Sequence, residues 1–413
     1  MKTVRFGIIG CGLMGREFAS AAARWCHLAA MDVRPEIVAV CDANPMFSGW
    51  FSERFASVRQ VTQDYRELLA NPEVDAVYIA VPHNLHEEFI CAAIAAGKHV
   101  MAEKPFGIDL AAGRQIMACL KKHPGVFVRC SSESPFFPAV QRIGKMLENG
   151  AFGQIIEANT GFLHSSDFDP EKPINWKRIV EFNGEYGVMG DLGLHACHAG
   201  FRAGWVPDNV RALLSNIVRE RPDGKGGRVP CLTWDNATLL CETTNPAGGE
   251  RFPWTIKTQR IAPGQKNNWY IEILGTRASV RWSSVHVDIL EVMTCQGGDQ
   301  VWGQIQTGHE TAFKTVTGNI FQFGFTDSIL QMWAAFLHEL HHGKPAQRFA
   351  GCATPEEALL SHRLFTAALE SQKECRVATV LVPYEPVSVI NNTLFANIQQ
   401  GISNKKGAVS QKP

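Results

Sequence analysis

The sequence predicts an α/β protein: a doubly wound parallel sheet in its first third, followed by an α/β domain with a large, mostly antiparallel open sheet. Two observations predict this division. Short apolar strand patterns alternate with helical patterns as far as residue 102, which is typical of parallel sheets covered by helices. From about residue 154, apolar strand patterns follow one another without intervening helices, which favours antiparallel pairing.

The N-terminal alternation can be followed along the chain. Each predicted strand is a short apolar run, and each predicted helix has small or apolar residues at helical spacing. The strands are expected at 4–9, 37–41, 76–81 and 99–102, and the helices at 15–28, 65–69 and 87–96. Ligands of such sheets bind beyond the carboxyl ends of the strands, which is where residues 82–84 and 103–105 fall.

The second half of the chain is rich in strands. They are expected at 155–163, 210–218, 237–243, 255–261, 269–274, 279–282 and 287–294. Loops rich in Gly and Pro are expected at 222–230 and 246–249. Two helices, at 326–342 and 355–373, are expected to close this domain. Residues 391–413 lose periodicity and are expected to form a tail.

The composition excludes several functional classes. The chain has 413 residues, with 40 basic and 40 acidic side chains, so no net charge favours nucleic acid or a membrane surface. No stretch approaches the roughly 20 apolar residues that span a bilayer. The twelve cysteines form no C-x-x-C pair, which argues against a disulfide scaffold or zinc knuckle and favours a reducing, cytoplasmic location.

The first strand pattern ends in a glycine motif. Gly10, Gly12 and Gly15 have the G-x-G-x-x-G spacing of a dinucleotide site. In such a site the glycines permit a tight turn, close approach of a pyrophosphate and close packing of helix on strand. The helix that follows offers N–H groups and a positive dipole end to phosphates. A plain structural turn is the alternative interpretation.

Asp42 follows the second predicted strand. An acidic residue there accepts the adenosine ribose hydroxyls of a dinucleotide, and its charge repels a 2′-phosphate. No Arg or Lys follows until Arg54, so the sequence favours NAD over NADP. Alternatively, Asp42 only ends the strand before a turn at Asn44 and Pro45.

Two groups of residues could carry chemistry. Lys104 lies at a strand end before Pro105, which restricts its backbone and permits a cis bond; it could polarise a substrate oxygen or form a salt bridge with Glu103. Asp191 and His195 share a helix face, and His195 is a candidate general base. His198 lies one step further along. A metal pair or a core histidine are alternatives for this cluster.

One metal-like pattern is set aside. His338 and His342 fit the H-E-x-x-H pattern of zinc proteases and share a helix face. His342 is followed at once by Gly343, so it ends the helix, and no third ligand motif follows. Basic side chains suit a helix C-terminus. The sequence therefore predicts no metal site. For a hydroxyl-rich substrate, further candidates are Trp176, Lys177, Tyr186 and His164.

Several motifs in one order resemble a known family. GIIGCGLMG, Asp42, VPHNLH, AEKPFG and GDLGLHACH are similar to motifs of the Gfo/Idh/MocA family, the glucose–fructose oxidoreductase and inositol dehydrogenase group. The similarity extends from Val4 to about Val377 and includes FLHELHHGKPAQRF. It implies a Rossmann domain at 1–132 and a substrate-binding and oligomerisation domain at 133–390. A homodimer or homotetramer through the C-terminal sheet is implied as well.

The resemblance also assigns residues to roles. Lys104, Asp191 and His195 match the family's catalytic positions. His195 would take the hydroxyl proton, Lys104 would hold the same oxygen, and Asp191 would orient His195 or bind a neighbouring hydroxyl. The expected cofactor-binding residues are Gly10, Gly12, Leu13, Met14, Gly15, Asp42, Pro82, Asn84, His86, Glu103 and Lys104. The expected substrate-binding residues are Lys104, Trp176, Tyr186, Asp191, His195 and His198.

Two departures from the family pattern concern substrate recognition. Glu133 and Ser134 stand where the family often has an Arg, and His198 stands where it commonly has an acidic residue. The expected function is NAD-dependent hydride transfer between nicotinamide and a secondary hydroxyl of a sugar, cyclitol or sugar derivative. The alternatives are an NAD-retaining glycosidase or lyase that oxidises its substrate transiently, and a non-catalytic NAD-binding regulatory protein.

Overall fold

The computed structural model describes residues 1–245, 249–296 and 298–380. The predicted tail at 391–413 and most of the loop predicted at 246–249 lie outside these residues. No helix within the described ranges is both long enough and apolar enough to cross a membrane.

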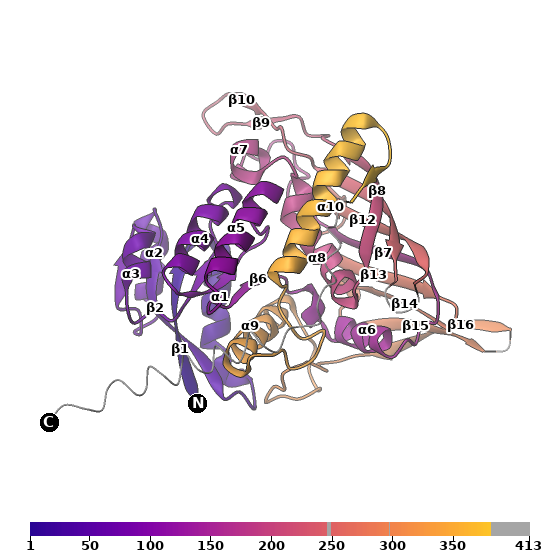
Figure 1. Ribbon diagram of the computed structural model, residues 1–413, viewed down its shortest axis with the longest axis horizontal. Coiled ribbons are helices and arrows are strands. Elements are labelled where there is room, and N and C mark those ends of the chain that lie inside the picture. The colour runs from indigo at the N-terminus through magenta and orange to yellow at the C-terminus, as the bar shows by residue number, and fades with distance from the viewer. Residues whose placement is uncertain (246–248, 297, 381–413) are drawn as a thin grey trace.

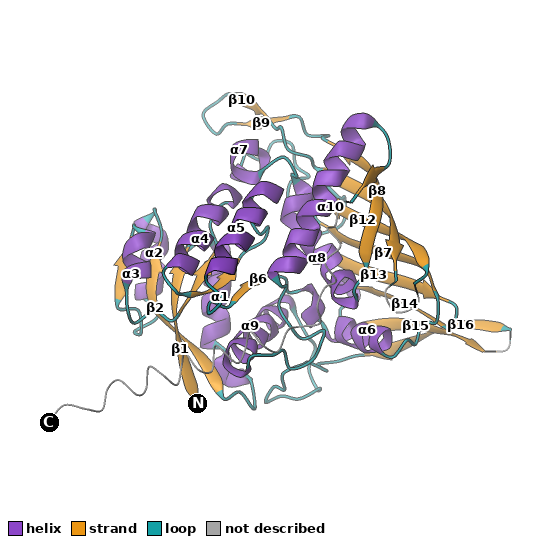
Figure 2. Ribbon diagram, viewed as in Figure 1, coloured by secondary structure: helices purple, strands orange, loops and turns teal. Residues whose placement is uncertain are grey.

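The N-terminal region is a six-stranded, fully parallel sheet in the order β3-β2-β1-β4-β5-β6. This order confirms the predicted doubly wound fold (Figure 2). Its strands are β1 (Lys2–Ile9), β2 (Val33–Cys41), β3 (Gln60–Thr62), β4 (Ala76–Ile79), β5 (His99–Ala102) and β6 (Val128–Cys130). Its helices are α1 (Leu13–Ala23), α2 (Pro45–Ser52), α3 (Tyr65–Ala70), α4 (His86–Ala95) and α5 (Leu110–Lys122). Helices α2 and α5 and the short strands β3 and β6 were not predicted.

One helix from the C-terminal part of the chain covers part of this sheet. Helix α9 (Phe325–His342) packs on α1, and the rings of Phe18 and Trp333 stack with centroids 3.7 Å apart. Its apolar residues share one core cluster with β1 and α1, whereas α4 and α5 belong to the cluster on the other face. Figure 1 shows α9 beside the N-terminal elements despite its late colour. The expectation that this helix closes the second domain is therefore wrong.

The second sheet has nine strands in the order β16-β15-β14-β13-β7-β12-β11-β8-β17. All neighbours are antiparallel except β7 and β12, so the sheet is mostly antiparallel, as predicted. The strands are β7 (Ile155–Leu163), β8 (Val206–Ser215), β11 (Asn236–Thr244), β12 (Arg251–Gln259), β13 (Asn268–Gly275), β14 (Ala278–Ser283), β15 (Ile289–Gln296), β16 (Asp299–Gln306) and β17 (Ala378–Thr379). The predicted loop at 222–230 is instead a small hairpin of β9 (Glu220–Pro222) and β10 (Arg228–Pro230).

Helices cover one face of this sheet. They are α6 (Pro138–Glu148), α8 (Val188–Ala203) and α10 (Pro355–Glu374) (Figure 1). On β11 the side chains alternate, with Leu239 buried toward the helices and Leu240 half exposed on the other face. Helix α8 packs on β7 and β12 and carries Asp191 and His195. These two residues lie between the second sheet and the strand ends of the N-terminal sheet.

Candidate active site

The glycine turn after β1 has the shape that a dinucleotide needs. Gly10 has φ +98°, and a Cβ there would lie 2.4 Å from the Ala80 carbonyl oxygen. A Cβ at Gly15 would lie 2.4 Å from the Gly10 carbonyl oxygen, so the helix approaches the strand closely. A Cβ at Gly12 would meet nothing within 4 Å. This open side is where backbone can approach a phosphate group.

Asp42 ties this turn to the end of β2. Its Oδ2 accepts a hydrogen bond of 2.7 Å from the Cys11 N–H, and its Oδ1 accepts one of 2.8 Å from the Asn44 N–H. Helix α1 begins at Leu13, two residues earlier than predicted, and Gly12 caps it without a side-chain hydrogen bond. Its first turn therefore presents backbone donors and a positive dipole end, as a pyrophosphate requires. The residues present fit a dinucleotide.

The carboxyl ends of β5 and β6 meet helix α8. Lys104, two residues beyond β5 and joined to Pro105 by a cis bond, donates hydrogen bonds of 2.8 Å from Nζ to both the backbone oxygen and Oδ1 of Asp191. The Asp191 side chain is 1% exposed and that of Lys104 is 15% exposed. The geometry thus brings two of the three predicted catalytic residues into direct contact.

Two more cations hold the same carboxylate. Lys177 Nζ lies 3.0 Å and 3.2 Å from the two oxygens of Asp191, and Arg260 pairs with Oδ2. Burial, followed by the charges of Arg260 and Lys104, lowers the pKa of Lys177 well below its ordinary value. Burial lowers the pKa of Arg260 to about 10. Three basic side chains thus converge on one carboxylate, and their N–H groups are donors that suit a polarised oxygen.

Sequence reasoning missed Arg260, and it listed Lys177 only as a substrate contact. Arg260 follows β12, and Lys177 lies on the one-turn helix η4 (Trp176–Arg178). Neither position has a local signal, because both meet Asp191 only through the fold of the second domain. The only indication in the sequence was that both residues are basic: Arg260 lies at the end of a predicted strand, and Lys177 lies between predicted elements.

His195 lies one helical turn beyond Asp191 and is 6% exposed. Its Nδ1 is 3.6 Å from Oε2 of Glu133, and neither atom has a hydrogen-bond partner among the described residues. Burial, followed by the charge of Lys104, lowers the pKa of His195 well below its ordinary value, so the imidazole is neutral and can accept a proton. Ser134 Oγ donates a 2.8 Å hydrogen bond to the His195 backbone oxygen.

Glu133 extends the site to the end of the next strand. It follows β6, and burial, followed by the charge of Glu103, raises its pKa to about 8. Glu103 itself is buried after β5 and accepts a 2.6 Å hydrogen bond from the Tyr78 hydroxyl. The strand ends of β5 and β6 therefore place two carboxyl groups around the Lys104 and His195 side chains.

The remaining predicted site residues differ in how they contact this cluster and in how exposed they are. The ring of Trp176 lies 4.8 Å from that of His83 after β4, and Lys177 Nζ lies 5.5 Å from the Trp176 ring. His164 ends β7 close to the charges of Arg260 and Lys177; burial and these charges lower its pKa to about 4. Along the glycine turn and the β4 end, Leu13 and Asn84 are exposed, and Met14 and Pro82 are half-buried.

Two predicted substrate contacts lie elsewhere. His198 is fully buried, with Nε2 3.2 Å from an Arg202 nitrogen and 3.6 Å from Oε2 of Glu357, so it belongs to an internal charged cluster. The Tyr186 hydroxyl donates to or accepts from Thr366 at 2.7 Å and accepts from the Leu110 N–H at 3.0 Å. Both side chains are buried and contact other residues of the protein, which gives no support to the predicted substrate contacts.

His86 is also placed differently from the prediction. It is fully buried, and its ring nitrogens lie 2.6 Å from the Pro105 oxygen and 2.9 Å from the Val81 oxygen. The imidazole thus joins the loops after β4 and β5 and has no nitrogen left for a cofactor. Its effect on the site is to fix the backbone next to Lys104.

The H-E-x-x-H pattern is used structurally. Glu339 accepts hydrogen bonds from Arg129 Nε at 2.8 Å and from the Cys352 N–H at 3.1 Å, and it is buried. The rings of His338 and His342 do share a face, with centroids 4.4 Å apart. Because Glu339 is occupied, it cannot act as the general base that a zinc protease needs.

Family comparisons match both halves of the chain. Residues 4–129 match the model described as "Oxidoreductase family, NAD-binding Rossmann fold". Residues 140–281 match the model described as "GFO/IDH/MocA C-terminal domain". Together these segments cover well over half of the chain.

Individual proteins are similar over long stretches. Levoglucosan dehydrogenase of Pseudarthrobacter phenanthrenivorans is 27% identical over 306 residues, which is 71% of this chain and 76% of the relative. Inositol 2-dehydrogenase of Acidothermus cellulolyticus is 34% identical over 158 residues, 38% of this chain and 44% of the relative. The structure of levoglucosan dehydrogenase with NADH and L-sorbose has a TM-score of 0.81 at 23% identity, covering 93% of this chain and all of that one.

Proposed function

Since the chain belongs to the Gfo/Idh/MocA family of oxidoreductases, whose N-terminal domain is an NAD-binding Rossmann fold, we propose that it is an NAD-dependent dehydrogenase. Its substrate class would be a sugar, a cyclitol or a sugar derivative with a secondary hydroxyl. The names of two relatives, levoglucosan dehydrogenase and inositol 2-dehydrogenase, support this class.

The observation that carries the proposal is the meeting of Lys104, Asp191 and His195. Lys104, beyond the end of β5, binds the buried carboxylate of Asp191, and His195, one helical turn further along α8, adjoins the carboxyl group of Glu133, at the strand ends where the glycine turn also lies. Alcohol oxidation needs a group that holds the oxygen and a base that takes its proton. Lys104 and His195 supply these two groups.

Each residue then has a defined task. Neutral His195 accepts the hydroxyl proton, and Lys104 donates a hydrogen bond to the oxygen as negative charge develops on it. Nicotinamide, when bound, accepts the hydride that leaves the same carbon. Asp191 positions Lys104, and Lys177 and Arg260 hold the Asp191 carboxylate in place. Glu133 lies beside the Nδ1 of His195, where, once ionised above about pH 8, its carboxylate stabilises the imidazolium that forms.

The proposed cofactor preference is NAD. Asp42 places a carboxylate at the end of β2, beside the glycine turn, and a carboxylate there repels a 2′-phosphate. Cofactor contacts are proposed for Gly10, Gly12, Leu13, Met14, Gly15, Asp42, Pro82, Asn84, Glu103 and Lys104. The change Asp42→Ala should lower the ratio of kcat/KM with NAD to that with NADP by about tenfold, since one repulsive charge is removed.

A substrate screen tests the function directly. Sugars and inositols are offered with NAD and with NADP, and NADH formation is followed by its absorbance. Net NADH formation with at least one substrate supports a dehydrogenase. Consumption of a substrate without net NADH would instead indicate the glycosidase or lyase alternative. If every substrate is left unchanged while NAD binds, the non-catalytic alternative is favoured.

We also propose that the enzyme forms a homodimer or homotetramer through the second sheet. Helices cover only one face of that sheet, and the uncovered face carries apolar side chains such as Leu213, Leu240 and Ile156, which are 64%, 50% and 55% exposed. Exposed apolar patches of this kind mark association surfaces. We propose a cytoplasmic location as well. The eleven cysteines whose side chains the structure describes are all free thiols, which fits a reducing compartment.

A further inference from the structure

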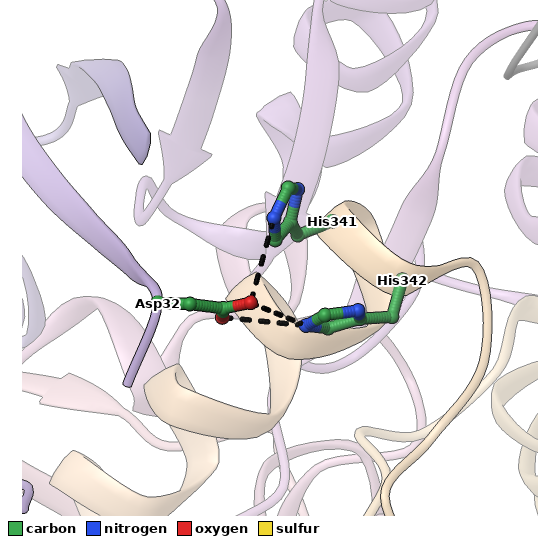
Figure 3. A group of neighbouring side chains, drawn as sticks. All are labelled: Asp32, His341 and His342. Atoms are coloured by element: carbon green, nitrogen blue, oxygen red, sulfur yellow. Dashed lines mark hydrogen bonds and ion pairs between the residues drawn. The ribbon is translucent and has the colours of Figure 1, made fainter. Parts of the chain in front are cut away.

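A second cluster of side chains, of types that bind metal ions, lies at the amino ends of the Rossmann strands, opposite the active site. Asp32 comes directly before β2, and His341 and His342 end helix α9 (Figure 3). One donor atom of each residue can be chosen so that all three lie within 4.8 Å of one another. The amino ends of the parallel strands lie here, whereas the active site lies at their carboxyl ends, so the two sites are separate.

We propose that Asp32, His341 and His342 form a binding site for a divalent transition-metal ion of the zinc type. Two imidazole nitrogens and one carboxylate oxygen are ordinary zinc ligands, and a fourth position remains for water. The site would join the segment before β2 to the end of helix α9, which are 309 residues apart in the sequence. Its expected role is to fasten α9 to the sheet that it covers.

The donor spacing fits such an ion. His342 Nε2 lies 3.1 Å from Asp32 Oδ2, and His341 Nε2 lies 3.7 Å from the same oxygen. Ligands at about 2.0–2.1 Å from a tetrahedral zinc ion are roughly 3.3 Å from each other, so the two observed spacings bracket the required one. Both imidazoles face the Asp32 oxygen with Nε2, and the chosen donor atoms of all three residues lie within 4.8 Å of one another.

The position of the histidines is unusual for simple surface pairs. Successive residues on a helix point about 100° apart, so neighbouring side chains do not normally face one point. Here both rings lie beside the Asp32 carboxylate, with His341 above it and His342 to its right in Figure 3. The carboxyl end of a helix also carries a partial negative charge, which favours a bound cation.

The charge of Lys2 near His341 opposes a bound cation, which predicts moderate affinity.

This site differs from the H-E-x-x-H pattern set aside above. That pattern uses His338 and His342 with Glu339 as the base, and Glu339 is occupied by Arg129. The proposed site uses His341 in place of His338, and its third ligand comes from the N-terminal domain. The sequence offered no signal for Asp32, because only folding brings it to the end of α9.

Zinc titration of the full chain tests the proposal. Exposed thiols could also bind zinc, so every protein carries Cys26→Ser and Cys375→Ser, the two exposed cysteines among those whose side chains the structure describes. Calorimetry with Zn²⁺ compares this parent with Asp32→Asn and with His342→Asn. The matched control is His286→Asn, which removes an exposed histidine on the second sheet. Circular dichroism verifies that each variant is folded.

The parent and the control should bind one Zn²⁺ per chain with micromolar affinity, and each site variant should bind at least about tenfold more weakly. Zn²⁺ should also raise the melting temperature of the parent, and a chelator should reverse the increase, because the ion binds the folded state. With Co²⁺ as a probe, the visible absorption of a tetrahedral site should appear in the parent and in the control, and it should be absent from both site variants. Unchanged zinc affinity in both site variants, or no binding by the parent, would overturn the proposal.

Discussion

The two halves of helix α8 use charge in different ways. In the first half, one carboxylate, Asp191, faces three basic side chains, and His195 lies one helical turn beyond it. In the second half, Arg202 and Glu357 form a paired contact, with Arg202 Nε 2.6 Å from Oε1 of Glu357, and His198 adjoins both. Both groups lie on the same helix, but their charge balance differs.

This difference separates function from stability. A balanced buried pair satisfies its own hydrogen bonds and fixes α10 against α8. An unbalanced cluster with unpaired polar atoms costs stability unless a ligand completes it, so such clusters mark active sites. Substitutions in one half of α8 at a time should therefore change different properties: kcat/KM in the first half and the free energy of unfolding in the second.

The largest effect is expected in the first half. Lys104→Met removes the hydrogen-bond donor to the reacting oxygen and should lower kcat/KM by about 10²–10³-fold, with little loss of stability. The measurement is NADH formation on the best substrate of the screen, together with a thermal melt. Lys145→Met, at a half-exposed lysine on α6, is the matched control and should leave kcat/KM unchanged.

The second half should respond in stability. Glu357→Gln leaves the Arg202 charge buried without its partner and should lower the free energy of unfolding by about 3–5 kcal/mol. Denaturant unfolding measures this change. The folded fraction should retain its kcat/KM; a large fall in kcat with unchanged stability would contradict the division between the two halves.

A smaller effect is expected at Glu133. Burial, followed by the charge of Glu103, raises its pKa to about 8, so it is protonated below that pH and becomes a carboxylate above it. The carboxylate favours a proton on His195, so kcat/KM for oxidation should rise a few-fold as the pH passes about 8. Glu133→Gln, which stays neutral, should lack this rise. A pH–rate profile with the same rise in the variant would contradict the role of Glu133.

Much of the fold was predictable because its signals are local. Strands β5 and β7 have the predicted bounds, since each is an apolar run between turn residues. Strand β16 was missed because its side chains are mostly exposed and polar, as befits an edge strand. The place of α9 was wrong because an amphipathic helix does not reveal which sheet it will cover.

The site was predictable where a motif carries it. Gly10, Lys104, Asp191 and His195 stand in motifs whose spacing is fixed by a turn, a strand end or a helix face. His198 was misplaced because residues three apart on a helix differ enough in direction for Arg202 to capture one of them. Arg260 reaches Asp191 only through tertiary structure, so no sequence pattern points to it.

The most direct test compares the two histidines of α8 in one assay. His195→Asn and His198→Asn are measured for NADH formation under identical conditions, with each protein's folded fraction taken into account. We predict that His195→Asn loses about 10²–10⁴-fold in kcat/KM, because it removes the general base, while His198→Asn keeps its rate and its pH profile. Equal losses in the two variants, or full activity in His195→Asn, would contradict the assignment of the active site.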